Sequence, residues 1–432
     1  MTAPRTRPPA DHRDDGGRTP AGPRPVPRTR TLRHGLTALA GLVAGLLVLA
    51  PCAPASAVDA STASGTAASA AVPSGTPYLP QPTGPHPVGR TSLHLVDTSR
   101  PDPWVPGVDV RELMVSVWYP AQPSDGQRAP YMTPTESKLL LEDGGITSVP
   151  LDVLTRTRTN AVSDAAPAGR RHGLPLIVLS PGFTKPRATL TSLAEDLASR
   201  GYVVAGIDHT YENVATTFPD GRVATCAACE VDHDETFWEK LVRGRAVDVS
   251  FVLDELTGPH PKWKGAGLID PHRIAMAGHS VGGASTSAAM LADSRIRAGI
   301  DIDGTTQVPV PDSGLARPFL FLGRQSTYTP GGGGAAATWE RDWEHLTGWR
   351  RWLVVAGAEH ASFTDVGLLA EQFGLDIGAT LPAARASQLT RRYTAAFFDL
   401  HLRSKPQRLM DQPSPRYPEV AFCSAEARGC GD

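Results

Sequence analysis

A serine between two glycines is the feature of this sequence with the clearest chemical meaning. Residues 278–282 read Gly-His-Ser-Val-Gly, which fits the G-x-S-x-G pattern of a sharp turn from a strand into a helix. Such a turn brings two backbones so close that larger side chains would collide, which explains the glycines. An apolar stretch at residues 274–277 precedes the motif, and small helix-compatible residues follow it. The pattern therefore predicts that Ser280 is the nucleophile of a serine hydrolase.

A serine hydroxyl needs a general base, and only two histidines follow Ser280 in the sequence. His360 comes shortly after an apolar stretch at residues 352–355, near the sheet edge where parallel strands end. His345 lies instead in a polar stretch with a helical pattern. Because hydrolases with this motif follow the order serine, acid, histidine, we predict that His360 is the base.

Two aspartates are candidates for the acid that orients this histidine. Asp303 lies beyond the end of a predicted strand at residues 298–302, where its side chain is free to reach across to the base. Asp301 belongs to the strand, and we expect it to be a structural partner within the sheet. The alternative place for the acid, after the strand at 319–322, contains no carboxylate, and Glu359 cannot easily turn back onto the adjacent ring. We therefore predict that Asp303 is the acid.

The negative charge that develops on an ester carbonyl oxygen requires two backbone N–H donors. Val281, directly after the nucleophile, supplies the first. The second is expected from the loop after the predicted strand at 176–179, which reads Ser-Pro-Gly-Phe. Since Pro181 has no N–H group, Gly182 and Phe183 remain, and we predict that Phe183 is the donor.

Other polar residues near these elements have structural interpretations as well as functional ones. Asp208 and His209 follow a predicted strand and could reach the substrate, although a role within the fold is the more common one. Arg245 and Asp248 lie three residues apart on a predicted helix, where we expect a structural pair. His279, beside the nucleophile, is expected to make packing and polar contacts. The sequence predicts no metal site and no cofactor.

Apolar runs and amphipathic segments alternate along most of the chain, which predicts parallel strands with helices on both faces of the sheet. An antiparallel hairpin precedes this alternation, and the combination predicts an α/β-hydrolase fold. A Gly- and Ala-rich stretch at residues 331–337 is expected to be a flexible insert. The expected hairpin strands are 92–97 and 112–119, the later strands are 176–179, 202–207, 274–277, 298–302, 319–322 and 352–355, and the helices are 189–200, 235–256 and 384–403.

The first 57 residues have the pattern of a secretory signal peptide. Eight arginines precede an uncharged apolar run at residues 36–49, and Ala-Ser-Ala at 55–57 fits a cleavage site. The run of about fourteen apolar residues is shorter than the roughly 20 that a membrane-spanning helix needs. We predict a signal peptide at 1–57, a flexible Ala/Ser/Thr-rich linker at 58–77, one hydrolase domain at 78–432, and secretion to the extracellular space.

Net charge and cysteine content agree with this compartment. Cleavage would remove eight arginines and three aspartates, which changes the formal charge from −2 to −7 and argues against a nucleic-acid partner. Four cysteines would remain, and an even number in an oxidising compartment indicates disulfides. Local pairs are the simplest arrangement, although two other connectivities are possible and a zinc site is a weaker alternative. The local pairs are Cys226 with Cys229 and Cys423 with Cys430.

Three stretches extend the pattern around the candidate residues. Residues 79–89 read Leu-Pro-Gln-Pro-Thr-Gly-Pro-His-Pro-Val-Gly, residues 113–120 read Leu-Met-Val-Ser-Val-Trp-Tyr-Pro, and residues 278–284 read Gly-His-Ser-Val-Gly-Gly-Ala. With these, the chain resembles the plasma-type (isoform II) platelet-activating factor acetylhydrolase family and its secreted bacterial relatives over residues 78–404. One departure is the Ser-Pro-Gly turn at 180–182, where the family often has His-Gly.

The resemblance implies the same roles for Ser280, Asp303 and His360, with oxyanion donors at Phe183 and Val281. It implies a calcium-independent hydrolase that removes short or oxidised acyl groups from phospholipids, with transient contact with a lipid surface. A broad lipase or esterase, a polyester hydrolase, a serine peptidase and a non-catalytic binding protein on the same scaffold are the alternatives. The preference for short acyl chains also follows from the lack of a long apolar lid helix in the sequence.

Overall fold

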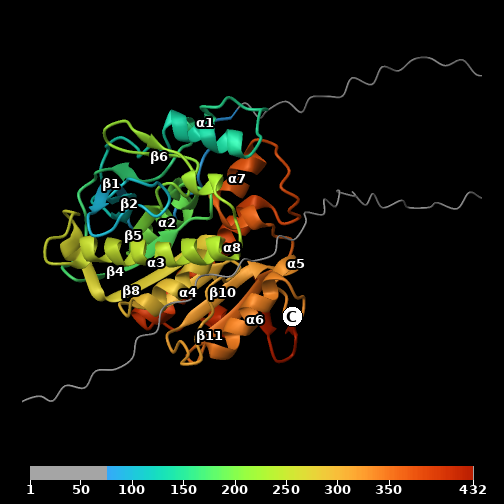
Figure 1. The fold of residues 1–432 in the computed structure, drawn as a ribbon. Coiled ribbons are helices and arrows are strands. Elements are labelled where there is room, and N and C mark those ends of the chain that lie inside the picture. Colours follow the sequence, from blue (N-terminus) through green and yellow to red (C-terminus); the bar gives the residue numbers. More distant parts are fainter. Residues whose placement is uncertain (1–74, 432) are drawn as a thin grey trace, which may run out of the picture. The chain divides into compact units, whose positions relative to one another are not determined.

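The computed structural model describes residues 75–431, so the predicted signal peptide and nearly all of the predicted linker lie outside the described residues. Eleven strands form one sheet in the order β13-β12-β11-β10-β9-β8-β4-β5-β2-β1-β3 (Figure 1). The strands of this sheet are β1 (Val88–Asp97), β2 (Arg111–Pro120), β3 (Val162–Ser163), β4 (Leu174–Ser180), β5 (Val203–Asp208), β8 (Ile269–His279), β9 (Ile296–Ile302), β10 (Phe319–Arg324), β11 (Arg350–Val355), β12 (Val420–Ser424) and β13 (Gly429–Gly431). A separate two-stranded sheet contains β6 (Thr216–Thr217) and β7 (Val223–Ala224).

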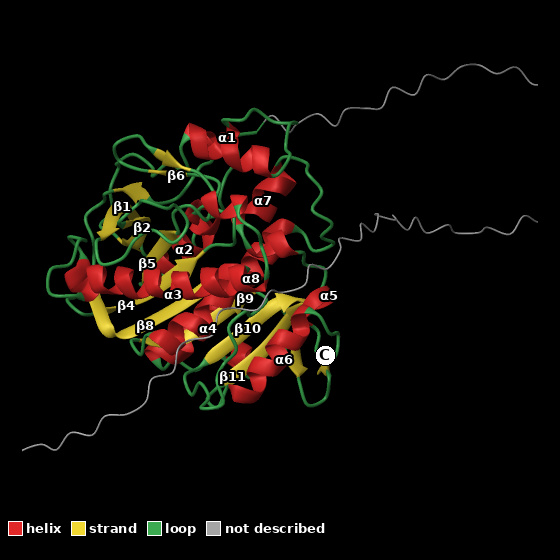
Figure 2. Ribbon diagram, in the orientation of Figure 1, coloured by secondary structure: helices red, strands yellow, loops and turns green. Residues whose placement is uncertain are grey.

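Helices fill most of the connections between these strands (Figure 2). The α-helices are α1 (Pro134–Asp143), α2 (Thr191–Ser199), α3 (Glu235–Thr257), α4 (Val281–Ala292), α5 (Gln325–Tyr328), α6 (Ala335–His345), α7 (Asp365–Gln372) and α8 (Ala383–Arg403). Short 3-10 helices are η1 (Val153–Arg156), η2 (Arg187–Leu190), η3 (Ala227–Glu230), η4 (Ala266–Leu268), η5 (His360–Phe363) and η6 (Arg408–Met410). Within residues 75–431, no helix combines the length and the apolar character needed to cross a membrane.

The central strands are apolar because both faces of the sheet are covered. Strands β4, β5, β8, β9, β10 and β11 run parallel to one another. Strands β1 and β2 form an antiparallel pair with Leu93 opposite Val115, and β2 is also antiparallel to β5. Successive residues of β4 enter opposite layers of the core: Ile177 packs with the α2 and α8 side chains, and Val178 packs with those of α3 and α4. This mostly parallel sheet with helices on both faces and an amino-terminal hairpin confirms the predicted α/β-hydrolase fold.

The carboxyl ends of the central parallel strands meet at one edge of the sheet. Ser280 follows β8 there, Asp303 follows β9, and His360 begins η5 shortly after β11. Strands β8, β9, β10 and β11 are consecutive neighbours in the sheet, so residues far apart in sequence are brought to the same edge. This edge therefore positions the candidate site.

Two parts of the chain differ from what the sequence suggests. The Ala-rich residues expected in a flexible insert form the first turn of α6, because they continue into a segment with buried Trp339 and Trp343. Only the preceding glycines, 331–334, form a connecting loop. At the end of the described chain, β12 and β13 extend the sheet beyond β11 as an antiparallel hairpin that was not predicted from the sequence.

Both predicted local disulfides are present. Cys226 and Cys229 enclose the start of η3, and Cys423 and Cys430 join β12 to β13 across the hairpin. The four cysteines are therefore paired as local loops rather than arranged as a zinc site.

Candidate active site

The turn around Ser280 has the strained geometry expected of a nucleophile elbow. Ser280 lies between β8 and α4 with φ of 57° and ψ of −128°, a conformation that non-glycine residues rarely adopt. Its N–H donates to the Ile302 carbonyl at 2.8 Å, which ties the turn to the neighbouring strand. A Cβ atom on Gly278 would lie 2.1 Å from the Gly282 backbone, so a glycine is required there. The fold thus presents the Ser280 side chain at the sheet edge.

The predicted acid and base are in direct contact. His360 Nδ1 lies 2.5 Å from Asp303 Oδ2. Asp303 is almost fully buried, whereas the His360 side chain is 44% exposed. The Arg324 backbone N–H donates to Asp303 Oδ1 at 2.8 Å, so both carboxylate oxygens are held. An imidazole held through Nδ1 leaves Nε2 available for proton transfer.

Asp301 occupies a different environment from Asp303. It is completely buried beneath the elbow, where its Oδ1 accepts from the Gly304 N–H at 2.9 Å. Among the described residues, its other oxygen has no hydrogen-bond partner, and burial raises the pKa of this carboxyl well above its usual range. Asp303 has φ of 56°, which interrupts the strand geometry and turns its side chain toward the histidine. The structure brings Asp303, and not Asp301, together with His360.

His279 supports the histidine loop from the elbow. Its Nε2 lies 2.8 Å from the His360 carbonyl oxygen, and the two rings are 4.4 Å apart. Burial and the neighbouring His360 lower the pKa of His279 well below its usual range, so its ring is neutral. The residue therefore donates one hydrogen bond that holds the backbone of His360.

The loop after β4 lies directly against the elbow. A Cβ atom placed on Gly182 would lie 3.3 Å from the Ser280 Cβ, so the backbone at Gly182 passes close to the serine. Within residues 75–431, the N–H groups of Gly182, Phe183 and Val281 donate to no protein acceptor. These free donors beside Ser280 are the groups from which an oxyanion site can be built. The Phe183 ring packs edge-on against Phe237 and Trp238.

A cavity of about 380 Å³ opens beside these residues. Its walls combine hydroxyl, amide and guanidinium groups with the rings of Trp238 and Tyr328. The lining residues are Trp238, Ser280, Val281, Asp303, Thr305, Gln307, Arg324, Thr327, Tyr328, Ala335 and His360. Serine, histidine and aspartate thus share a cavity of a size that holds a small substrate.

Most of this lining was not predicted from the sequence, and Arg324 is the clearest case. Arg324 ends β10, the strand next to β9, and its side chain donates to Thr327 Oγ1 at 2.6 Å. Its Nε lies 3.8 Å from Asp303 Oδ2, which places a positive charge beside the acid. The available signal was that parallel neighbours end at the same edge, so a polar residue at the end of β10 must lie near Asp303.

One group of potential metal ligands coincides with this site. Ligand atoms of His279, Asp303 and His360 lie within 4.8 Å of one another. However, His279 Nε2 is engaged with the His360 backbone, and His360 Nδ1 is engaged with Asp303. The hydrogen-bond pattern is that of an oriented base rather than of a metal site.

The polar residues at the end of β5 do not reach this cavity. His209 is 1% exposed and Asp208 is completely buried, so neither meets the expectation of a substrate contact. His209 Nε2 lies 3.0 Å from Ser180 Oγ, and its Nδ1 lies 2.7 Å from Asp248 Oδ2. Arg245 and Asp248 are structural, but each pairs with residues outside helix α3 rather than with the other.

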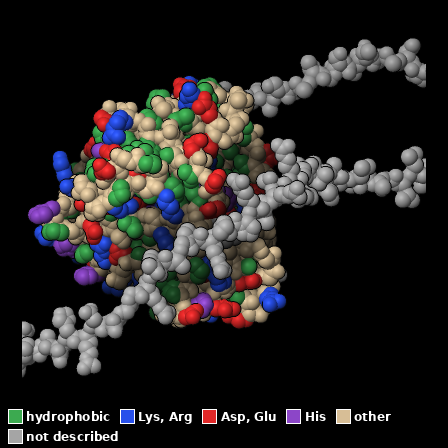
Figure 3. All heavy atoms as spheres, viewed as in Figure 1, with side chains coloured by type: hydrophobic (Ala, Val, Ile, Leu, Met, Phe, Trp, Pro, Cys, Tyr) green, Lys and Arg blue, Asp and Glu red, His purple; other side chains and the backbone are tan. Residues whose placement is uncertain are grey.

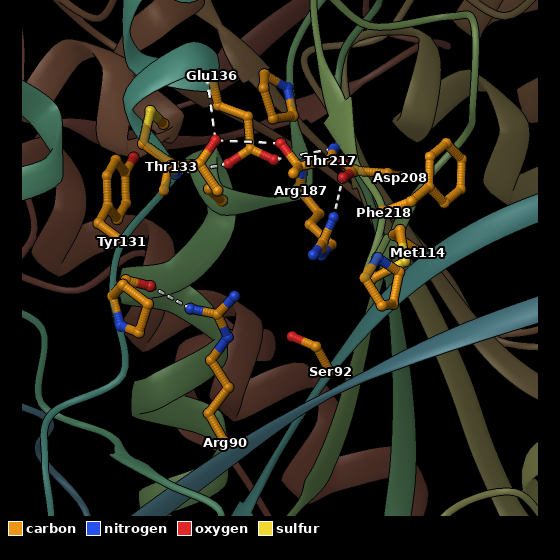
Figure 4. Close-up of a pocket in the computed structure, with 15 residues that line it drawn as sticks. Arg90, Ser92, Met114, Tyr131, Thr133, Glu136, Arg187, Asp208, Thr217 and Phe218 are labelled. Atoms are coloured by element: carbon orange, nitrogen blue, oxygen red, sulfur yellow. Dashed lines mark hydrogen bonds and ion pairs between the residues drawn. The ribbon is translucent and has the colours of Figure 1, made fainter. Parts of the chain in front are cut away.

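Asp208 instead belongs to a second cavity, of about 280 Å³, beside β1 and β2 (Figure 4). Figure 4 shows the guanidinium groups of Arg90 and Arg187 on its wall. Both groups donate to the Ser116 Oγ, at 3.1 Å from Arg90 and 2.8 Å from Arg187. Arg187 forms an ion pair with Asp208, and burial lowers the pKa of Arg187 to about 10. Glu136 adds a second carboxylate to the lining, so the cavity has no excess of positive charge.

Comparison with known proteins identifies several relatives. The family model for platelet-activating factor acetylhydrolase, isoform II, matches residues 71–254. A probable 1-alkyl-2-acetylglycerophosphocholine esterase from Arthroderma benhamiae is 29% identical over 382 residues, which cover 80% of this chain and 93% of the relative. A platelet-activating factor acetylhydrolase from Cavia porcellus is 24% identical over 283 residues, covering 56% of this chain and 60% of the relative.

A solved structure is more similar in sequence than these relatives. It is described as a ferulic acid esterase from Streptomyces cinnamoneus and is 44% identical to this chain, with a TM-score of 0.73. The match covers 81% of this chain and 100% of the esterase. All of these relatives are named for hydrolysis of esters.

Proposed function

We propose that this chain acts as a secreted serine hydrolase through Ser280, His360 and Asp303. The chain belongs to the platelet-activating factor acetylhydrolase isoform II family, and its relatives are named as ester hydrolases. The observation that carries this proposal is the Asp303–His360 contact of 2.5 Å at the cavity that Ser280 lines. A strained serine beside an oriented imidazole is the arrangement that acyl transfer requires.

The proposed reaction has two halves. The Ser280 oxygen attacks the ester carbonyl while His360 Nε2 takes the serine proton, and His360 then gives this proton to the departing alcohol. Water attacks the resulting acyl-serine while His360 takes a proton from it, and His360 returns this proton to the Ser280 oxygen as the carboxylic acid leaves. Asp303 holds the imidazole and stabilises its cation, and the N–H groups of Val281 and Phe183 receive the developing oxyanion.

We propose short acyl esters as the first substrate class. The family's names point to acetyl esters of phospholipids, and the cavity of about 380 Å³ has polar groups over much of its wall. A long alkyl chain would gain little from contact with such a wall, since the gain is about 25 cal/mol for each Å² of apolar surface buried.

A second candidate class is supported by the 44% identical ferulic acid esterase. The rings of Trp238 and Tyr328 line the cavity together with the Gln307 amide. Aromatic walls can stack on a planar acyl group, and the amide can bond to its ring substituents. Esters of hydroxylated aromatic acids therefore form the main alternative to acetyl esters.

One hydrolysis panel tests the function and separates these classes. The panel contains an acetyl phospholipid, p-nitrophenyl esters from C2 to C16, the methyl ester of ferulic acid and a peptide amide, with Ser280→Ala as the blank. We expect Ser280-dependent ester cleavage without added metal and a kcat/KM maximum at short or aromatic acyl groups. A maximum at C12 or longer would indicate a lipase, and equal rates for wild type and Ser280→Ala would end the serine-hydrolase proposal.

Secretion is a separate proposal, supported by the residue pattern at 1–57 and by the two disulfides. Expression of the full chain in a secreting bacterial host should release active protein into the medium with Val58 at its amino terminus. Protein that stays inside the cells with residues 1–57 attached would contradict this proposal.

A further inference from the structure

The loop that supplies the candidate oxyanion donors is held by a buried polar cluster that is not part of the active-site cavity. We propose that Arg245 and Glu212, called here the loop clamp, are positioning residues that fix Gly182 and Phe183 for oxyanion binding. This inference rests on the proposed function.

Arg245 reaches the loop from helix α3. Its Nη1 donates to the Pro181 carbonyl at 2.5 Å and to Ser180 Oγ at 3.2 Å. Its Nε donates to Glu212 Oε2 at 2.7 Å, and both side chains are 1% exposed. A buried guanidinium that makes these three bonds holds the beginning of the loop firmly.

Glu212 holds the other end of the same loop. Its backbone carbonyl accepts from the Thr184 N–H at 3.0 Å, and its side-chain Oε1 accepts from Trp104 Nε1 at 2.9 Å. The loop clamp therefore binds the Pro181 carbonyl at one end of the loop and the Thr184 N–H at the other. The two residues between these anchors are Gly182 and Phe183, whose N–H groups donate to no acceptor within residues 75–431.

Peptide geometry connects the clamp to the chemistry. The Pro181 carbonyl and the Gly182 N–H belong to one planar trans peptide group, so their bonds point in opposite directions. When Arg245 fixes the oxygen, it also fixes the direction of the Gly182 N–H on the other side of the plane. The Phe183 N–H, the donor in the proposed mechanism, belongs to the next peptide group, which is held between this anchored group and the one whose Thr184 N–H donates to the Glu212 carbonyl. The bond to a cation also polarises the peptide group, which makes the N–H a stronger donor.

A second set of hydrogen bonds holds the Ser180 side chain. His209 is neutral because burial, followed by the charge of Arg245, lowers its pKa below the usual range. The pattern of contacts assigns one consistent direction: Arg245 donates to Ser180 Oγ, the serine hydroxyl donates to His209 Nε2, and His209 Nδ1 donates to Asp248. This chain fixes Ser180 immediately before the loop.

Kinetics of Arg245 variants test the loop clamp on p-nitrophenyl acetate. We expect Arg245→Gln to lower kcat by about ten- to a hundredfold with a much smaller change in KM, because misplaced donors weaken the transition state rather than substrate binding. The kcat of Arg245→Lys should lie between those of Arg245→Gln and wild type, since one ammonium group cannot bind both the Pro181 carbonyl and the Glu212 carboxylate as the guanidinium does. Arg243→Gln, an exposed arginine on the same helix, is the matched control and should behave as wild type.

Affinity for a trifluoromethyl ketone, which forms a tetrahedral oxyanion on the serine, provides the readout that a purely structural role would not change. In clamp variants whose melting temperatures show that they are folded, affinity for the ketone should fall in parallel with kcat/KM. Glu212→Gln loosens the same clamp and carries the test if both arginine variants fail to fold. Folded clamp variants that match Arg243→Gln, or that lose kcat without losing ketone affinity, would overturn the clamp alone. A wild type without esterase activity would overturn the proposed function, and the clamp with it.

Discussion

Two serine–histidine–aspartate arrangements lie close to the loop after β4, and they differ in exposure. In the first, Ser280 and Asp303 lie at the active-site cavity with His360, whose side chain is 44% exposed. In the second, Ser180, His209 and Asp248 form a continuous hydrogen-bonded chain in which no residue is more than 1% exposed.

The hydrogen-bond pattern alone therefore does not identify a catalytic group. The buried serine has no access to an ester, and its hydroxyl oxygen already accepts a bond from Arg245. Ser280 instead has a strained backbone at a helix start, and nearby N–H groups donate to no acceptor among residues 75–431. Access, backbone strain and adjacent N–H donors distinguish the proposed reactive serine from the structural one.

Replacing each serine by alanine should give the largest contrast. Ser280→Ala should lower ester turnover on the order of 10⁵-fold, because the members of a catalytic triad act as a unit. Ser180→Ala should keep its activity within about a hundredfold of wild type, because only the loop after β4 is loosened. The same change should lower the free energy of unfolding by about 1–3 kcal/mol, since His209 loses a buried hydrogen-bond partner. Turnover of p-nitrophenyl acetate and urea denaturation measure the two effects.

Labelling with a fluorophosphonate sharpens the same contrast. The reagent should modify Ser280 in the folded protein and leave Ser180 unmodified, as read by peptide mass spectrometry. Modification of Ser180 in the folded protein would show that this serine is accessible, which would contradict its interpretation as a buried structural residue.

The aspartates should separate in a similar way, with a smaller effect on activity. Asp303→Asn should reduce kcat about 10⁴-fold, because the histidine loses the partner that fixes its tautomer. Asp301→Asn should change kcat little, since burial raises the pKa of Asp301 well above its usual range and an amide resembles the neutral acid. Steady-state kinetics at neutral pH measure both variants. Equal small effects would place the acid elsewhere, and Glu359 would be the next residue to replace.

Much of the fold and the candidate site could be predicted because the signals are local. Apolar runs mark the central strands, and glycines whose side chains would collide mark the elbow. The order serine, acid, histidine then selects the residues that the sheet edge brings together. The α6 start was missed, because the alanines at 335–337 read as flexible until Trp339 and Trp343 anchor the helix in the core.

The loop clamp could not be predicted for a different reason. Arg245 and Glu212 come from separate elements, and their contact depends on how α3 packs over the loop after β4. A helix pattern predicts which residues lie on its buried face but not which distant backbone carbonyl one of them will reach. Burial of several charges in one cluster is a property of the tertiary structure, and only the packed coordinates reveal it.

The smallest expected effect concerns His209, the histidine of the buried arrangement, and the pH dependence of the free energy of unfolding. Burial and Arg245 lower the pKa of His209 in the folded state, although Asp248 and Glu212 oppose this shift. Because His209 binds a proton near pH 6.5 in the unfolded chain and only at lower pH in the folded chain, this residue should contribute a loss of stability as pH falls below about 6.5. The slope of this contribution is at most about 1.4 kcal/mol per pH unit. Urea denaturation at pH 7.5, 6.5 and 5.5 should show that His209→Gln loses less stability over this range than wild type, while an exposed-histidine control, His260→Gln, follows wild type. Identical pH dependence in His209→Gln and wild type would mean that His209 keeps its ordinary proton affinity in the folded protein, and the neutral hydrogen-bond chain through Ser180 would have to be revised.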